Sequence, residues 1–166
     1  QWSSSAASDV YKRQALGYDV LREATVSNNT GVGYQALKNN TTGTENVAVG
    51  ANALDANTTA SQNTALGFEA LSSCTTGIRN TALGRKALKS ITTGTQNVAV
   101  GSADMFNNTA SNNVAVGHDA MVANTTGTEN TSVGGNSLDA NTTGNFNSAL
   151  GRSALGSNTT GGNNTG

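Results

Sequence analysis

Side chains that could carry out chemistry are few and scattered in this sequence. The single histidine, His118, stands beside Asp119, where an imidazole and a carboxylate could share a proton. The chain is a tandem repeat, described below, and these two residues occupy repeat positions whose residue type differs from one repeat to the next. A solvated surface pair is therefore the better interpretation. Catalysis needs convergent titratable groups around a pocket, and Asp and Glu do not recur at any fixed spacing. We therefore expect a protein that is not an enzyme.

The same scarcity argues against metals, cofactors and charged partners. Cys74 is the only cysteine, so it cannot form an internal disulfide, and we expect it to be a small core residue. Without recurring carboxylates the chain has no calcium-binding repeat. Nine Lys/Arg and ten Asp/Glu are scattered along the chain, which leaves no basic stripe for nucleic acid or for a membrane surface. No apolar run approaches the roughly 20 residues that span a bilayer.

The dominant feature is a tandem repeat. The pattern Asn-[Thr/Val]-Ala-[Val/Leu]-Gly recurs with Asn at 29, 46, 63, 80, 97, 113, 130 and 147, and six of the seven intervals are 17 residues and one is 16. We number the repeat positions 1–17 from each of these Asn residues, and call the residues at one position a row. Two short strand-like stretches per repeat, separated by Gly and Asn-Thr-Thr-Gly, are too brief for helices. The repeat predicts an all-β, parallel β-solenoid of about 17 residues per coil, with its handedness left open.

Side-chain alternation along a strand assigns an inside to each coil. Position 4 is always branched and aliphatic, position 2 should point the same way, and position 9 is Leu or Met outside the shorter coil. Position 12 is usually Asn but becomes Cys74 and Ile91, which suggests an inward row of stacked amides. The expected core rows are position 2 (Thr30, Val47, Thr64, Thr81, Val98, Val114, Thr131, Ser148), position 4 (Val32, Val49, Leu66, Leu83, Val100, Val116, Val133, Leu150) and position 9 (Leu37, Leu54, Leu71, Leu88, Met121, Leu138, Leu155).

By the same alternation, positions 1, 3 and 5 of the first strand should form a flat outward face. Its residues are Asn46, Ala48, Gly50, Asn63, Ala65, Gly67, Asn80, Ala82, Gly84, Asn97, Ala99, Gly101, Asn113, Ala115, Gly117, Asn130, Ser132, Gly134, Asn147, Ala149 and Gly151. A second outward row is expected at position 13, comprising Thr41, Thr58, Thr75, Thr92, Thr109, Thr125, Thr142 and Thr159. Asn ladders and close turns could by themselves dictate the small residues. The opposite alternation would instead place Thr/Val and Val/Leu outside and the small residues inside.

Both ends of the chain stand apart from the regular array. Residues 4–14 read SSAASDVYKRQ, which resembles the in-frame translation of a transposase sequencing adapter, so residues 1–14 are expected not to be natural protein. Residues 15–166 then form one repeat array. Because Asn164-Thr165-Gly166 opens a further coil, we expect a fragment of a longer array, and a missing secretion signal carries no meaning.

Two resemblances cover residues 15–166. Asn46-Val47-Ala48-Val49-Gly50 and its equivalents resemble the tandem Asn-x-Val-x-Gly and Asn-x-Ala-x-Gly motifs of ice-binding proteins from polar microalgae. The stretch of residues 63–71, NTALGFEAL, resembles a repeat of bacterial and phage tail fibres and trimeric adhesin heads. The first resemblance implies an ice-binding solenoid and the second an extracellular structural or adhesive module that self-associates into a trimer or fibre. Both imply an extracellular location.

Overall fold

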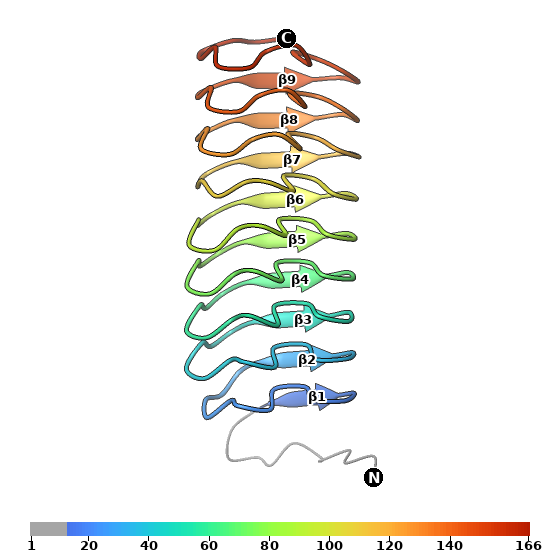
Figure 1. The fold of residues 1–166 in the computed structure, drawn as a ribbon, viewed down its shortest axis with the longest axis vertical. Helices are drawn as coiled ribbons and strands as arrows, with labels where there is room; N and C mark the ends of the chain where they lie inside the picture. Colours follow the sequence, from blue (N-terminus) through green and yellow to red (C-terminus); the bar gives the residue numbers. More distant parts are fainter. Residues whose placement is uncertain (1–12) are drawn as a thin grey trace.

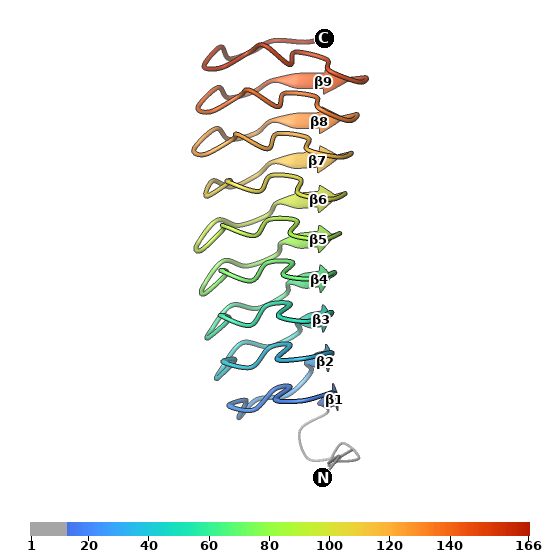
Figure 2. The same ribbon diagram turned by 45° about the vertical axis from the view of Figure 1, so that its right-hand side comes forward.

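The computed structural model describes residues 13–166 as a straight stack of coils, each with one three-residue strand on the same side (Figures 1 and 2). The strands are β1 (Gln14–Leu16), β2 (Thr30–Val32), β3 (Val47–Val49), β4 (Thr64–Leu66), β5 (Thr81–Leu83), β6 (Val98–Val100), β7 (Val114–Val116), β8 (Thr131–Val133) and β9 (Ser148–Leu150). No helix occurs in this described part of the chain.

Each strand pairs in parallel with the strand of the next coil, in the sheet order β1 to β9. The register is position for position, as in Val47↔Thr64 and Val49↔Leu66. Successive coils therefore stack at the parallel-strand spacing of about 4.8 Å. The predicted parallel β-solenoid with about 17 residues per coil is confirmed.

The second strand-like stretch expected in each coil is instead a series of turns. Position 9 has positive φ in every coil, for example +51° at Leu54, and position 7 does so too, as Asn52 shows at +57°. Left-handed backbone bends the chain and ends any extended run. Hydrogen bonds between coils continue through these turns, including the bond from Leu54 N–H to the Ala70 carbonyl at 3.1 Å. The whole circumference of each coil, and not only its strand, is thus bonded to its neighbours.

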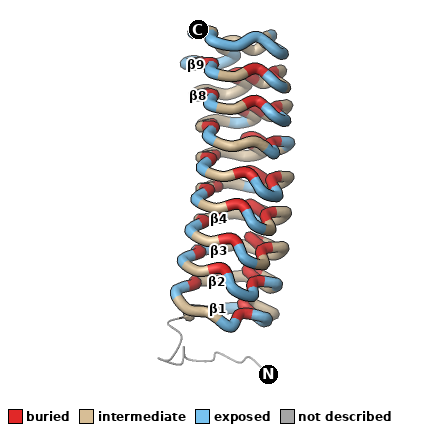
Figure 3. The backbone as a smooth tube through the Cα atoms, turned by 90° about the vertical axis from the view of Figure 1, so that its left-hand side faces the viewer, coloured by how far each residue is buried: buried red, intermediate tan, exposed pale blue. Residues whose placement is uncertain are grey.

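Buried residues recur at the same places in successive coils (Figure 3). The inward rows are positions 1, 3, 8, 9, 12 and 15. The predicted core positions 9 and 12 are confirmed, because Leu54, Asn57 and Cys74 are fully buried. In the shorter coil, Met105 occupies the position 9 row and is also fully buried.

The expected alternation along the strand is wrong. The central strand residue at position 3 is buried in β2 to β9, whereas positions 2 and 4 are exposed or half-buried, as Val47 (40% exposed) and Leu66 (49% exposed) illustrate. The coil is narrow, and the Leu row at position 9 lies in the core together with the position 3 row. Little room remains for a second layer of branched side chains, so Ala faces in and Val or Leu faces out.

The structure describes only the last two residues of the adapter-like segment, Arg13 and Gln14. Residues 1–12, which contain most of the adapter-like segment, lie outside the described residues. Gln14 belongs to β1, and its N–H donates to the Asn29 carbonyl at 3.0 Å.

Candidate functional site

The flat outward face expected from positions 1, 3 and 5 is not a surface. Every Asn and every Ala or Ser assigned to it is buried, with exposure of at most 2%. The corrected residues are Asn46, Ala48, Asn63, Ala65, Asn80, Ala82, Asn97, Ala99, Asn113, Ala115, Asn130, Ser132, Asn147 and Ala149. The position 5 glycines Gly50, Gly67, Gly84, Gly101, Gly117 and Gly134 are half-buried, and only Gly151 is exposed. The residues at positions 1, 3 and 5 are small because they pack within the coil. They do not form a contact surface.

The position 1 asparagines form a hydrogen-bonded ladder inside the rod. The side-chain oxygen of each Asn from Asn29 to Asn147 accepts the backbone N–H of the next Asn at 2.9–3.0 Å. The side-chain amide donates to the position 15 carbonyl of its own repeat at 2.8–2.9 Å. A buried backbone N–H and a buried carbonyl are satisfied in each coil. This requirement explains why Asn recurs at position 1 of every coil from Asn29 onward.

The position 13 threonines are exposed or half-buried, as expected. Most of their hydroxyls donate to the backbone carbonyl of the position 13 residue in the next coil, at 2.8–3.3 Å. These hydrogen bonds fix the side-chain rotamers and use the donor of each hydroxyl. The row therefore presents methyl groups and hydroxyl oxygens at regular intervals.

A second threonine row, at position 14, escaped the sequence reasoning. It comprises Thr42, Thr59, Thr76, Thr93, Thr126, Thr143 and Thr160, and every member is exposed. Within residues 13–166 none of these hydroxyls has a hydrogen-bond partner. The shorter coil lacks this position, since Asn108-Thr109 is followed directly by Ala110. The sequence shows that position 14 never admits a charged residue, but the exposure of this row is evident only in the structure.

The outward side of the sheet is a further regular surface. Position 2 is Thr or Val, two side chains of the same shape, in every strand from β2 to β8, and position 4 is Val or Leu. The most exposed of these apolar residues are Leu16, Val47, Leu66 and Leu150. No charged residue occurs at positions 2 to 4 of any coil. Together these two rows form an uncharged, largely apolar strip along the rod, which we call the strand face.

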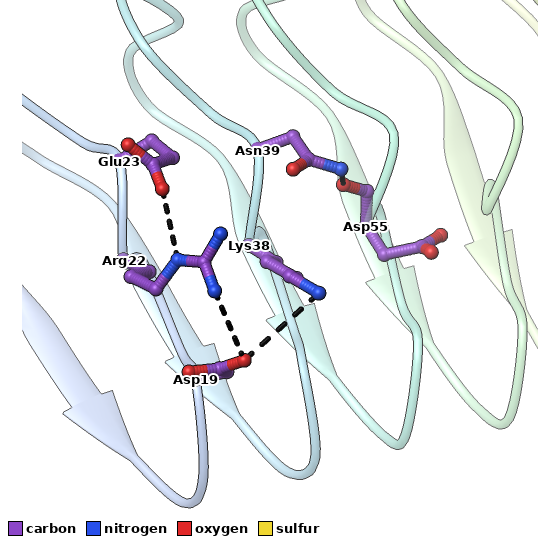
Figure 4. Close-up of polar contacts among 6 residues, drawn as sticks. All are labelled: Asp19, Arg22, Glu23, Lys38, Asn39 and Asp55. Atoms are coloured by element: carbon purple, nitrogen blue, oxygen red, sulfur yellow. Dashed lines mark hydrogen bonds and ion pairs between the residues drawn. The ribbon is translucent and has the colours of Figure 1, made fainter.

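Charged side chains gather on the segment that follows the strand. Figure 4 shows Asp19 contacting both Arg22 (3.4 Å) and Lys38 (3.9 Å), while Arg22 also bonds Glu23 at 2.8 Å. Burial raises the pKa of the nearby Asp55 carboxyl, whose Oδ1 has no hydrogen-bond partner among residues 13–166. The Asn39 amide donates to the Asp55 backbone carbonyl at 2.7 Å. The charges of these acidic and basic side chains largely cancel. No group of three or more potential metal ligands occurs in residues 13–166.

One carboxylate lies in the core. Asp104 stands at position 8, where most coils have Ala, and it is fully buried. Burial raises the pKa of this carboxyl to about 6, although its oxygens accept the N–H groups of Gly117 and Ala120, both at 3.1 Å. Burial also raises the pKa of the Cys74 thiol to about 11. The His118 side chain is 69% exposed and lies 3.1 Å from the Asp119 carboxylate.

Comparison with protein-family models, with curated proteins and with solved structures finds no match for this chain. Nothing in the described residues is a helix long and apolar enough to cross a membrane. The geometry is that of a β-solenoid with repetitive surfaces, which is compatible with an ice-binding protein or a fibre module. The regular surfaces are the two threonine rows and the strand face.

Proposed function

We propose that this chain is a non-enzymatic, extracellular ice-binding solenoid whose contact surface is the paired threonine rows at positions 13 and 14. The observation that carries the proposal is the position 14 row of exposed threonines with unpartnered hydroxyls. Ice offers a lattice of water molecules without charge or pockets, so its receptor needs hydroxyl and methyl groups repeated at fixed intervals.

The coil spacing and the stiffness of threonine support this role. Adjacent members of a row lie about 4.8 Å apart, a separation comparable with that of water molecules in an ordered layer. A β-branched side chain has few rotamers, so little conformational entropy is lost on adsorption. The position 13 hydroxyls are already oriented by their bonds to the next coil, as Thr41 shows with the Thr58 carbonyl at 2.9 Å. Neither row contains a charged residue that would hold its own hydration shell.

The proposal is tested by thermal hysteresis and by the shape of ice crystals grown with the purified chain. The double variant Thr59→Lys, Thr76→Lys should abolish both effects and leave the circular dichroism spectrum unchanged, because both side chains are exposed. The matched control is Thr64→Lys, Thr81→Lys on the strand face, which should keep the activity. Unchanged activity in the first variant would refute the proposed surface, and a wild-type chain without effect on ice would refute the function.

A second candidate is a structural or adhesive module that self-associates through the strand face. The exposure of Leu66 (49%) and Leu150 (77%) favours it, because a continuous apolar strip on a soluble rod marks an interaction surface. Sedimentation analysis separates the two candidates. A stable trimer or fibre without ice activity, dispersed by Leu66→Asp with Leu83→Asp, supports self-association, whereas a monomer that shapes ice supports the first proposal.

A further inference from the structure

Aromatic side chains follow one another at position 6 of the first coils. Tyr18, Tyr34 and Phe68 stand at this position with 68%, 50% and 44% exposure. The rings of Tyr18 and Tyr34, in adjacent coils, are stacked with their centroids 5.7 Å apart and their planes 8° from parallel. The coil spacing thus suits ring-on-ring stacking along this row.

Ala51 interrupts the row between Tyr34 and Phe68. The three residues lie in successive coils, since Asn52 N–H donates to the Tyr34 carbonyl at 2.8 Å and Glu69 N–H donates to the Ala51 carbonyl at 3.0 Å. Two coil steps separate the positions of Tyr34 and Phe68 by about 9.6 Å. A planar group midway would lie about 4.8 Å from each ring, within the range of about 4.5–7 Å found for stacked rings. The spacing therefore leaves room for one planar group between Tyr34 and Phe68.

Two side-chain amides without hydrogen-bond partners among residues 13–166 neighbour Tyr34 and Ala51 in the chain. Gln35 and Asn52, each directly after a position 6 residue, are half-buried, and their side-chain amides have no hydrogen-bond partner among residues 13–166. The next acid in this row, Glu69, is already bonded to Lys89 Nζ at 2.7 Å. The groups available to a ligand are thus two aromatic faces and two neutral amides, each of which both donates and accepts.

We propose that Tyr34, Ala51 and Phe68 form a binding site for one pyranose ring of a neutral glycan. A pyranose has apolar C–H faces that stack on the two aromatic rings and a rim of hydroxyls that can bond the amides of Gln35 and Asn52. The site is exposed, so the ligand keeps much of its rim in water. A wholly apolar ring would leave both amides unused, and a charged sugar would find no free counter-charge in these groups. This inference does not depend on the ice-binding proposal.

The test is affinity electrophoresis of the full chain in gels containing dextran, hydroxyethyl cellulose or yeast mannan. We expect retardation in at least one gel, with apparent affinity reduced about tenfold by Tyr34→Ala or Phe68→Ala. The decisive variant is Ala51→Phe, which fills the interruption and should abolish retardation. The Tyr18–Tyr34 stack shows that adjacent coils accommodate two rings, so this variant should keep the wild-type circular dichroism spectrum.

The control variant is Phe146→Ala, which removes an aromatic side chain of similar exposure (53%) at position 17. It should bind as the wild type does. Migration unaffected by all three polysaccharides, or undiminished retardation of Ala51→Phe, would overturn the proposal. A loss as large in Phe146→Ala as in Phe68→Ala would also overturn it, because binding would then follow general surface hydrophobicity.

Discussion

Replacing Asp104 with Ala should stabilise the protein at neutral pH. This carboxyl is fully buried, and its pKa of about 6 stands well above the ordinary value of 3.8. The ionised form is therefore less favourable in the folded chain than in the unfolded one. The penalty is absent below about pH 4, grows as the pH rises, and is complete above about pH 6.

The size of the effect follows from the two pKa values. A difference of about two pH units corresponds to about 3 kcal/mol. The N–H groups that Asp104 accepts need not be left unsatisfied. In most other coils, the N–H of the position 8 residue bonds the position 5 carbonyl of its own coil, as Ala87 does with Gly84 at 3.4 Å. Gly117 N–H already donates to the Val100 carbonyl at 2.9 Å. Most of this amount, about 3 kcal/mol, should therefore appear as a higher free energy of unfolding of Asp104→Ala at neutral pH.

The assay is urea unfolding followed by circular dichroism at pH 4 and at pH 7.5. Asp104→Ala should raise the midpoint at pH 7.5 and leave it nearly unchanged at pH 4. The control, Glu129→Ala, removes an exposed acid and should shift neither midpoint by a comparable amount. A gain of equal size at both pH values would refute the reasoning, because the effect would then come from packing and not from the buried charge.

Three further predictions concern the internal framework. Asn63→Ala removes two hydrogen bonds, of 2.9 and 2.8 Å. It leaves the buried Asn80 N–H without a partner and the Gly77 carbonyl with only the weak Cys74 thiol bond, so the free energy of unfolding measured in urea should fall by about 2–5 kcal/mol. Asn57→Cys also leaves a buried N–H, that of Ala60, but a thiol in this row can still donate to the position 15 carbonyl as Cys74 does, so the same measurement should show a smaller loss of about 1–3 kcal/mol. A larger loss than in Asn63→Ala would contradict distinct roles for the two rows. Gly84→Ala should lower the free energy of unfolding by about 3 kcal/mol or more, because φ is +137° and the added Cβ would meet the Gly101 carbonyl oxygen at 2.1 Å. The control Gly135→Ala, whose added Cβ has its nearest contact at 3.8 Å, should change the thermal midpoint little.

The prediction of which strand residues face the core was wrong for a specific reason. Hydrophobicity alone places Val49 inside and Ala48 outside, yet the structure has the reverse. Burial in a narrow coil is limited by volume as well as by polarity, because close packing leaves no space for a second branched row. The strict smallness of position 3 and the invariance of Asn at position 1 were the available signals of confinement. They describe the inside of the rod and not a ligand surface.

The sequence by itself determined the repeat, the parallel solenoid, and the buried rows at positions 9 and 12. Periodicity decides these features, since equal residues at equal spacing must occupy equivalent places in stacked coils. Only the tertiary structure decided which side of the strand faces the core, that Leu54 adopts positive φ, and that the position 14 threonines stand free. Those features depend on how a 17-residue coil closes around its own side chains, and a period carries no information about the space inside.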